Sequence, residues 1–169
     1  MITLVDVYET RNWEFLYRLL DERKSWQSIS HKEMPTFEDH VKFVNSKPYK
    51  HWYLVKRNLS EEYIGAVYIS KYNEIGIFLL EKHTYKGFGK IILETLFEKH
   101  KEIPMFYANV APLNSMSLAF FANNGFKHFR PTLDKEENYI VQYTFLKLNP
   151  CFENEHESIS AEESILPPD

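Results

Sequence analysis

Cysteine is almost absent from this sequence, and so are the features of a secreted or membrane-spanning chain. The single cysteine, Cys151, cannot form an internal disulfide and has no partner thiols for a zinc site. No stretch approaches the ~18 consecutive apolar residues of a membrane span. The N-terminal segment carries neither the cationic stretch nor the apolar run of a secretory signal. These absences predict a soluble, cytoplasmic protein.

A strong charge of either sign is also missing. The formal net charge is −4, but residues 149–169 hold six acids and no Lys or Arg, so the body before them is close to neutral. This balance argues against a nucleic-acid or membrane-surface partner. The seven histidines, at positions 31, 40, 51, 83, 100, 128 and 156, form no helical pair, so no metal is expected.

The length of 169 residues, with 44% hydrophobic and 16% aromatic content, fits one domain, which we place at residues 1–148. Residues 149–169, rich in Glu, Ser and Pro, are predicted to be an acidic, disordered tail. Periodicity and turn residues predict mixed α/β structure. The expected order is a strand at 2–8, a helix after Thr10 or Asn12, a helix from Thr36, strands at 51–55, 63–69 and 75–80, a helix at 87–100, a strand at 104–110, a helix from Asn114 to Asn124, and strands at 126–130 and 139–148.

The most informative stretch is the apolar run 75–80 with the glycines that follow it. Gly87 and Gly89 stand where a strand turns into a helix, and they allow successive backbone N–H groups to point outward at one spot. The free first-turn donors and the helix dipole suit a phosphate, and Lys86 and Lys90 add positive charge. The alternative is that the glycines only make a tight connection.

The spacing of these glycines excludes two common phosphate loops. A dinucleotide fingerprint needs glycine where Ile92 stands, and a nucleotide P-loop needs one at Thr84. The helix after the loop is predicted to place four apolar residues on one face, namely Ile91, Ile92, Leu96 and Phe97.

Two motifs together resemble a known family. The segment Tyr85–Lys90, between an apolar strand and an amphipathic helix, is similar to the acyl-CoA pyrophosphate loop of the GNAT family of N-acetyltransferases. At the expected distance, Asn114–Phe126 resembles the family helix that runs from an asparagine to a terminal Gly-Phe. The resemblance implies a GNAT-like, single-domain α/β fold with a mixed, mostly antiparallel sheet, helices on both faces and a splayed central strand pair.

The resemblance also implies a co-substrate, acetyl-CoA, and places its contacts. The pantetheine arm is expected between the splayed strands on main-chain groups, and the pyrophosphate on the backbone of the glycine loop. The family usually has Gln or Arg three residues before the first glycine, whereas this chain has Thr84, which removes one anchor. The implied contacts are Ile77, Phe78 and Leu79 on the strand, Tyr85, Lys86, Gly87, Phe88, Gly89 and Lys90 on the loop, and Asn114.

Acyl transfer to an amine needs a base, because an ammonium ion has no lone pair. By position Glu74 matches carboxylates that serve this role in the family, with His51 and His83 as imidazole alternatives. The backbone N–H of Leu79 is the matched donor to the oxyanion. Where the family often has a tyrosine acid, this chain has Phe121, which cannot donate a proton. Water or Tyr107 is expected to substitute.

The amine acceptor is a small molecule whose identity the sequence leaves open. In the family, the connection between the first two helices helps form the acceptor pocket, which makes Trp26 and His31 candidate contacts together with His51. Residues 37–43 and the aromatic strand that follows weakly resemble acetyltransferases of nucleotide-linked amino sugars. The alternatives are a protein N-terminal acetyltransferase and a non-catalytic acyl-CoA-binding module. A homodimer is compatible with the sequence.

Overall fold

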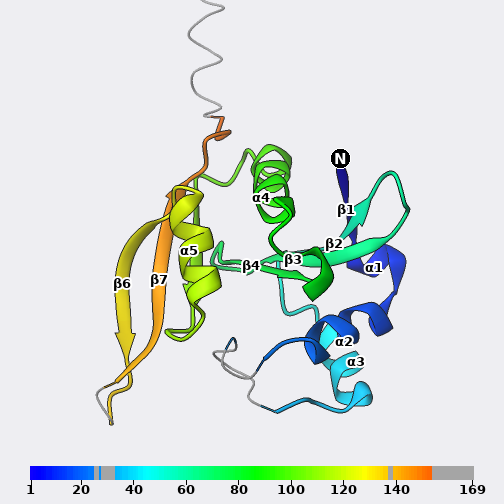
Figure 1. Cartoon of the computed structure of the whole chain (residues 1–169), viewed down its shortest axis with the longest axis horizontal. Coiled ribbons are helices and arrows are strands. Elements are labelled where there is room, and N and C mark those ends of the chain that lie inside the picture. The colour runs from blue at the N-terminus through cyan, green and yellow to red at the C-terminus, as the bar shows by residue number, and fades with distance from the viewer. Residues whose placement is uncertain (25–26, 28–32, 137–138, 154–169) are drawn as a thin grey trace, which may run out of the picture.

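The chain folds into two antiparallel sheets that meet at one corner (Figure 1). The computed structural model describes residues 1–24, 27, 33–136 and 139–153. The first sheet has the order β1-β2-β3-β4, and its strands are β1 (Ile2–Asp6), β2 (His51–Arg57), β3 (Tyr63–Ile69) and β4 (Ile75–Leu79). The second has the order β5-β7-β6, and its strands are β5 (Met105–Val110), β6 (Lys127–Leu133) and β7 (Ile140–Leu148).

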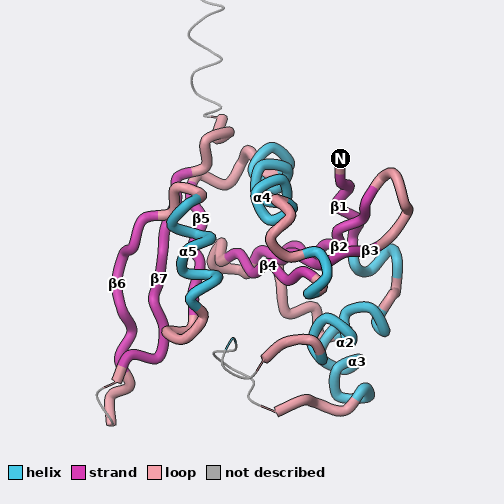
Figure 2. Tube along the Cα trace, viewed as in Figure 1, coloured by secondary structure: helices cyan, strands magenta, loops and turns pink. Residues whose placement is uncertain are grey.

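The two sheets are linked where β4 and β5 begin. Glu74 forms an isolated parallel bridge with Tyr107, and the Tyr107 N–H donates to the Asn73 carbonyl at 3.0 Å. Beyond this point the two strands belong to different sheets, and they diverge (Figure 2). The predicted α/β fold with a splayed strand pair is therefore confirmed.

Helices cover both faces of the first sheet (Figure 1). Asparagine or threonine side chains cap three of them. Asn12 accepts a hydrogen bond from the Phe15 N–H, Thr36 accepts one from the Asp39 N–H, and Asn114 accepts one from the Ser117 N–H. On one face lies α4, on the other lie α2 and α3, and α5 packs on the second sheet. The bounds are α1 (Val7–Thr10), α2 (Trp13–Asp21), α3 (Phe37–Asn45), the short 3-10 helix η2 (Glu81–His83), α4 (Phe88–Lys99) and α5 (Ser115–Asn123).

Each face of the first sheet has its own apolar core. The larger core joins α4, α5 and both sheets, and the smaller lies between the sheet and α1, α2 and α3. One detail of the predicted α4 face is wrong, because Ile91 is 37% exposed and Leu93 is buried instead. At about 100° per residue, Ile92, Leu93, Leu96 and Phe97 share a face that excludes Ile91.

The segment after β7 stays against the body of the domain as far as it is described. Asn149 is buried, and its Nδ2 donates to the carbonyls of His100 and Ile103 at 3.0 and 2.9 Å. Its Oδ1 accepts from the Cys151 N–H at 3.0 Å. Residues 149–153 of the predicted tail thus brace the C-terminal end of α4, and residues 154–169 lie outside the described residues.

We expect Asn149→Ala to lower the free energy of unfolding by roughly 1–3 kcal/mol, because buried carbonyls at the end of α4 lose their donor. Urea denaturation measures the change. A matched control is Asn58→Ala, which removes only an exposed hydrogen bond from Thr3 and should change stability by less than about 0.5 kcal/mol. Equal losses in the two variants would contradict the bracing role.

Candidate active site

A groove of about 320 Å³ runs along the open edge of β4. It passes Ile77, Phe78 and Leu79, continues to Thr84 and Tyr85 before the glycine loop, and reaches Asn114 at the start of α5. The structure thus brings together the segments to which the sequence assigned the co-substrate. Leu19, Glu22, Arg23, Lys24 and Gln27 close the groove from the side of α2.

Main-chain donors on β4 point into this groove. The Leu80 N–H donates to the Ile64 carbonyl on β3 at 2.9 Å. Successive N–H groups of a strand point to opposite edges, so those of Leu79 and Ile77 point toward the splayed side. The same alternation turns the main chain of Phe78 toward β3, and Phe78 lines the groove with its side chain.

The glycine loop contains two residues in the left-handed backbone region, which is also found in main-chain anion-binding nests. Gly87 is the N-cap of α4 with φ +81°, and Tyr85 also has a positive φ, of 56°. A Cβ at Gly87 would meet no protein atom within 4 Å, so the space in front of this residue is open. Lys86 and Lys90 are exposed, Phe88 and Gly89 are half-buried, and Lys90 lies 3.8 Å from Glu94.

Asn114, which caps the start of α5, and Phe121, in the middle of this helix, both have structural roles. Asn114 is 7% exposed, and its Oδ1 is used to cap the helix at the Ser117 N–H. Phe121 lies in the larger core against Phe126, with the ring centroids 5.0 Å apart. It therefore acts as a packing residue at the position where the family often has a tyrosine.

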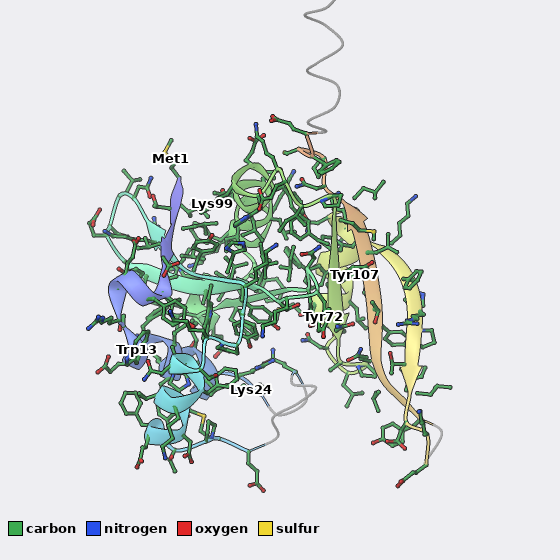
Figure 3. The ribbon with its side chains drawn as sticks, turned by 180° about the vertical axis from the view of Figure 1, so that it is seen from behind. Met1, Trp13, Lys24, Tyr72, Lys99 and Tyr107 are labelled. Carbon is green, nitrogen blue, oxygen red and sulfur yellow. The ribbon has the colours of Figure 1, made fainter. Side chains whose placement is uncertain are left out.

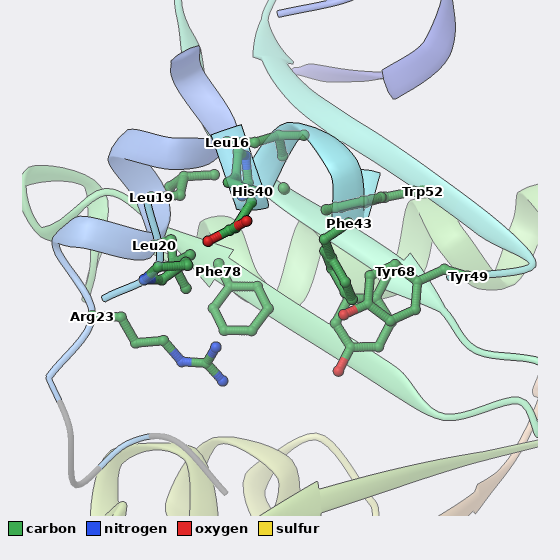
Figure 4. Close-up of a pocket in the computed structure, with 13 residues that line it drawn as sticks. Leu16, Leu19, Leu20, Arg23, His40, Phe43, Tyr49, Trp52, Tyr68 and Phe78 are labelled. Atoms are coloured by element: carbon green, nitrogen blue, oxygen red, sulfur yellow. The ribbon is translucent and has the colours of Figure 1, made fainter. Parts of the chain in front are cut away.

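A second cavity, of about 280 Å³, lies on the face of the first sheet that α2 and α3 cover (Figure 4). Its walls are mostly apolar and aromatic, and its polar members include Arg23, Asp39 and His40. It shares three lining residues with the groove, namely Leu19, Arg23 and Phe78. The two spaces therefore adjoin at the side chain of Phe78.

Two stacked tyrosines form the wall of this cavity nearest to Glu74. The rings of Tyr49 and Tyr68 lie 3.8 Å apart and 5° from parallel. Burial raises the pKa of Tyr49 to about 12, an effect that Arg23 opposes and Glu74 adds to. Burial likewise raises the pKa of Tyr68 well above its ordinary value, so both phenols stay protonated near neutrality.

Glu74 occupies a half-buried position at the junction of the sheets. A tight turn sets it there, because Ser70 Oγ accepts from the Glu74 N–H at 3.1 Å and Asn73 adopts φ 63°. Burial raises the pKa of the Glu74 carboxyl, and a hydrogen bond from the Asn109 side chain partly offsets the shift. Desolvation therefore makes this carboxylate a stronger base than an exposed one.

Asn109 on β5 is held by the neighbouring strand. Its Oδ1 accepts from Thr144 Oγ1 at 2.7 Å and from Gln142 Nε2 at 3.2 Å, which leaves its amide N–H groups for Glu74. The sequence did not single out Asn109. Phe106, Ala108 and Val110 alternate along β5 and are buried, so the sequence could have predicted the face on which Asn109 lies. Only the fold shows that the carboxylate beside Asn109 is that of Glu74.

Tyr107, the predicted substitute acid, lies on β5 beside the turn that carries Tyr72 and Asn73 (Figure 3). It is half-buried and forms the bridge with Glu74. The main chain of Tyr107 therefore lies beside that of Glu74, and its role as the acid stays a prediction.

The two histidines weighed as alternative bases lie elsewhere. His83 is buried, with its Nε2 3.4 Å from Glu62 Oε1 and its ring against Phe88. The ring of His51 packs against His100 on the sheet face that α4 covers, with centroids 4.2 Å apart. Its neighbour Trp52 lines the cavity instead, so the predicted acceptor contact at His51 is not supported by its position.

His51, His100 and Glu102 come together although the histidines are scattered in the sequence, with their potential ligand atoms within 4.8 Å of one another. Protein groups already occupy both nitrogens of His100, since Nε2 lies 3.0 Å from the Tyr53 hydroxyl and Nδ1 lies 3.0 Å from Glu102. This cluster ties the end of α4 to β2.

The remaining acceptor candidates, Trp26 and His31, lie outside the described residues. The helices on either side of them, α2 and α3, both contribute to the cavity. Arg23, Tyr49 and Tyr68 line it as well, and the sequence alone did not single them out. Their convergence depends on contacts between distant segments, which periodicity does not predict.

Comparison with protein families matches residues 9–126 to the Acetyltransferase (GNAT) family. The match covers most of the chain, and the protein belongs to this family. The predicted class of enzyme, an N-acetyltransferase that uses acetyl-CoA, is confirmed by this membership. No curated protein sequence matches the chain.

Solved structures with the same fold include two acetyltransferases with bound coenzyme A. A spermidine N-acetyltransferase from Vibrio cholerae, in complex with CoA and spermine, is 16% identical with a TM-score of 0.74, covering 90% of this chain and 98% of that one. A ribosomal-protein alpha-N-acetyltransferase in complex with coenzyme A is 19% identical with a TM-score of 0.70, covering 89% of this chain and 95% of that one. At these identities the likeness establishes the fold.

Within the described part of the chain, no helix combines the length and the apolar character needed to cross a membrane.

Proposed function

We propose that this enzyme transfers the acetyl group of acetyl-CoA directly to the primary amine of a small molecule bound in the cavity of Figure 4. The observation that carries the proposal is the junction of the groove and the cavity at Phe78. A thioester lying along β4 would meet an amine from the cavity there, so no acetylated enzyme intermediate is needed.

In the proposed reaction, the amine nitrogen attacks the thioester carbon and a C–N bond forms. The carbonyl oxygen becomes an oxyanion that accepts from the Leu79 N–H. Glu74 takes the amine proton, directly or through water, and the C–S bond then breaks to release the CoA thiolate. Since a thiol pKa is about 8.5, the thiolate leaves tolerably well, and Tyr107 or water supplies its proton.

The co-substrate contacts predicted from the sequence are retained in this proposal. The pantetheine lies against Ile77, Leu79 and Asn114, and the Phe78 side chain borders both the groove and the cavity. The diphosphate rests on the amides of the loop 85–90, where the helix dipole and the lysines favour an anion.

For the acceptor, a nucleotide-linked amino sugar remains the first candidate and a protein N-terminus the second. The test measures CoA release with an amino-sugar nucleotide, short peptides with free N-termini, and spermidine, which the structural relative acetylates. Turnover that depends on the amino-sugar nucleotide supports the first candidate, and reaction of peptides alone overturns it. Tight acetyl-CoA binding with no turnover of any amine would contradict the direct-transfer proposal.

The oligomeric state stays a prediction. One matched structure, a spermidine N-acetyltransferase, is described as dodecameric. Sedimentation of the full chain, with and without acetyl-CoA, would decide between a homodimer and other forms.

A further inference from the structure

We infer that the acceptor carries an anionic group near its amine, a carboxylate or a phosphate, which Arg23 binds. This inference rests on the proposed transfer to an amine in the cavity, and it adds the chemical class of the acceptor. The evidence is an arginine that lines both the groove and the cavity and that has no carboxylate partner in the part of the chain that the structure describes.

Arg23 is fixed by its neighbours, but no carboxylate of the described residues pairs with its charge. It follows α2, and its N–H donates to the Leu20 carbonyl at 3.2 Å. The guanidinium carbon lies 4.4 Å from the centroid of the Phe78 ring, a cation–π geometry. Among the described residues, no ion pair involves Arg23, and its buried Nε has no hydrogen-bond partner.

The position of this cation suits a ligand rather than the fold. Arg23 lines both the cavity and the groove, and in Figure 4 its side chain and the two tyrosines lie on opposite sides of Phe78. Burial lowers the pKa of Arg23, which indicates that the charged form is incompletely compensated by the protein. An anion at this point would supply the missing partner, and a guanidinium binds carboxylates and phosphates with paired hydrogen bonds.

The charges around the cavity disfavour a polycation. Among the described residues that line it, the one carboxylate is Asp39, which already accepts from Thr36 Oγ1 at 2.9 Å and lies 3.6 Å from Lys42 Nζ. Glu74, beyond the tyrosines, serves in the proposed reaction as the base. A polyamine would place its second ammonium group near Arg23, and like charges repel.

The test uses pairs of acceptors that differ only in the anion. One pair is an amino-sugar phosphate and the unphosphorylated amino sugar, and the other is a dipeptide amide with Glu or Gln beside the N-terminal residue, where the C-terminal amide removes the second carboxylate; spermidine is the cationic comparison. We expect wild-type kcat/KM to favour the anionic member of at least one pair by about 10- to 100-fold, the range for a charged hydrogen bond. The pair that responds identifies phosphate or carboxylate as the anion.

The variant Arg23→Gln should abolish this preference by raising KM for the anionic acceptor. Arg130→Gln, an exposed arginine on β6, is the matched control and should behave as wild type. Circular dichroism and thermal melting show that each variant is folded, and calorimetry measures its affinity for acetyl-CoA.

Four results would overturn the inference. Equal reaction of both members of each pair would overturn it, and so would preferred acetylation of spermidine. Both results leave the proposed transfer activity intact. A loss of acetyl-CoA affinity in Arg23→Gln, with the acceptor preference unchanged, would assign Arg23 to the co-substrate. No turnover of any amine would overturn the proposed function and the inference with it.

Discussion

Glu74→Gln should lower kcat by about 10²- to 10⁴-fold, the range typical of a lost general base. The substitution keeps the shape of the side chain and its contact with Asn109, but it removes the basic oxygen. Acetyl-CoA affinity should stay within about twofold, because the glycine loop and the β4 edge are untouched. Steady-state kinetics with a saturating acceptor, together with calorimetry, separate the two effects.

The pH profile provides a second readout of the same residue. A base works when deprotonated, so wild-type kcat/KM should fall as the pH drops through a pKa that lies above the ordinary value of 4.5 for glutamate. Glu74→Gln should lose this acidic limb. The exposed Glu14→Gln on α2 is the control, and it should preserve both the rate and the profile. A variant at Glu74 with wild-type turnover across the whole pH range would remove this carboxylate from the mechanism.

The thermal stability of Glu74→Gln at pH 7 should rise relative to wild type, whereas its activity should fall. Because burial raises the pKa of folded Glu74 above its unfolded value, the protonated carboxyl favours folding, and this contribution is lost as the pH rises through the folded pKa. Glutamine stays neutral throughout. We therefore expect Glu74→Gln to unfold at a higher temperature than wild type at pH 7, and at a similar temperature below the unfolded pKa.

Gly87→Val should weaken acetyl-CoA binding by at least about tenfold. A side chain at φ +81° is strained, by roughly 1–2 kcal/mol for a residue other than glycine. It would also project into space that is open in the protein and that the diphosphate is proposed to occupy. Titration calorimetry with acetyl-CoA measures the affinity, and thermal melting measures the strain.

The chain offers a matched control in Gly125, which also has φ +81°. It follows α5, away from the groove, and a Cβ there would meet only the flexible end of Lys147. Gly125→Val should therefore lose stability and keep its acetyl-CoA affinity. Equal loss of affinity in both variants would mean that strain, rather than occupation of the phosphate site, explains the result at Gly87.

The groove proposed for the co-substrate could be predicted from the sequence because its determinants are local. A strand, a turn with Gly87 in the left-handed region and a helix start are contiguous, and a separate capped helix begins at Asn114. The cavity proposed for the acceptor could not be predicted in the same way. Arg23, Tyr49 and Tyr68 come from three separate segments, and only the packing of α2 and α3 on the sheet brings them together.

The differences between the sequence predictions and the structure also have physical causes. His51 and Trp52 are adjacent on β2, so they lie on opposite faces of the sheet, and the sequence does not say which face holds the cavity. Both faces of β2 are covered, which removes the polar alternation that would have decided it. The prediction that Ile91 lies on the buried side of α4 is wrong for a related reason. A helix beside two sheets has a broad apolar surface, so the sequence does not show where the buried face ends.

The link between Glu74 and Tyr107 has a mechanical consequence. It is the one β-bridge between the two sheets among the described residues, so the proposed base sits where the two sheets join. A pantetheine arm lying between β4 and β5 would contact both sheets beyond that bridge. Binding of the first substrate would then add contacts between the two strands that hold Glu74 and its neighbour Asn109.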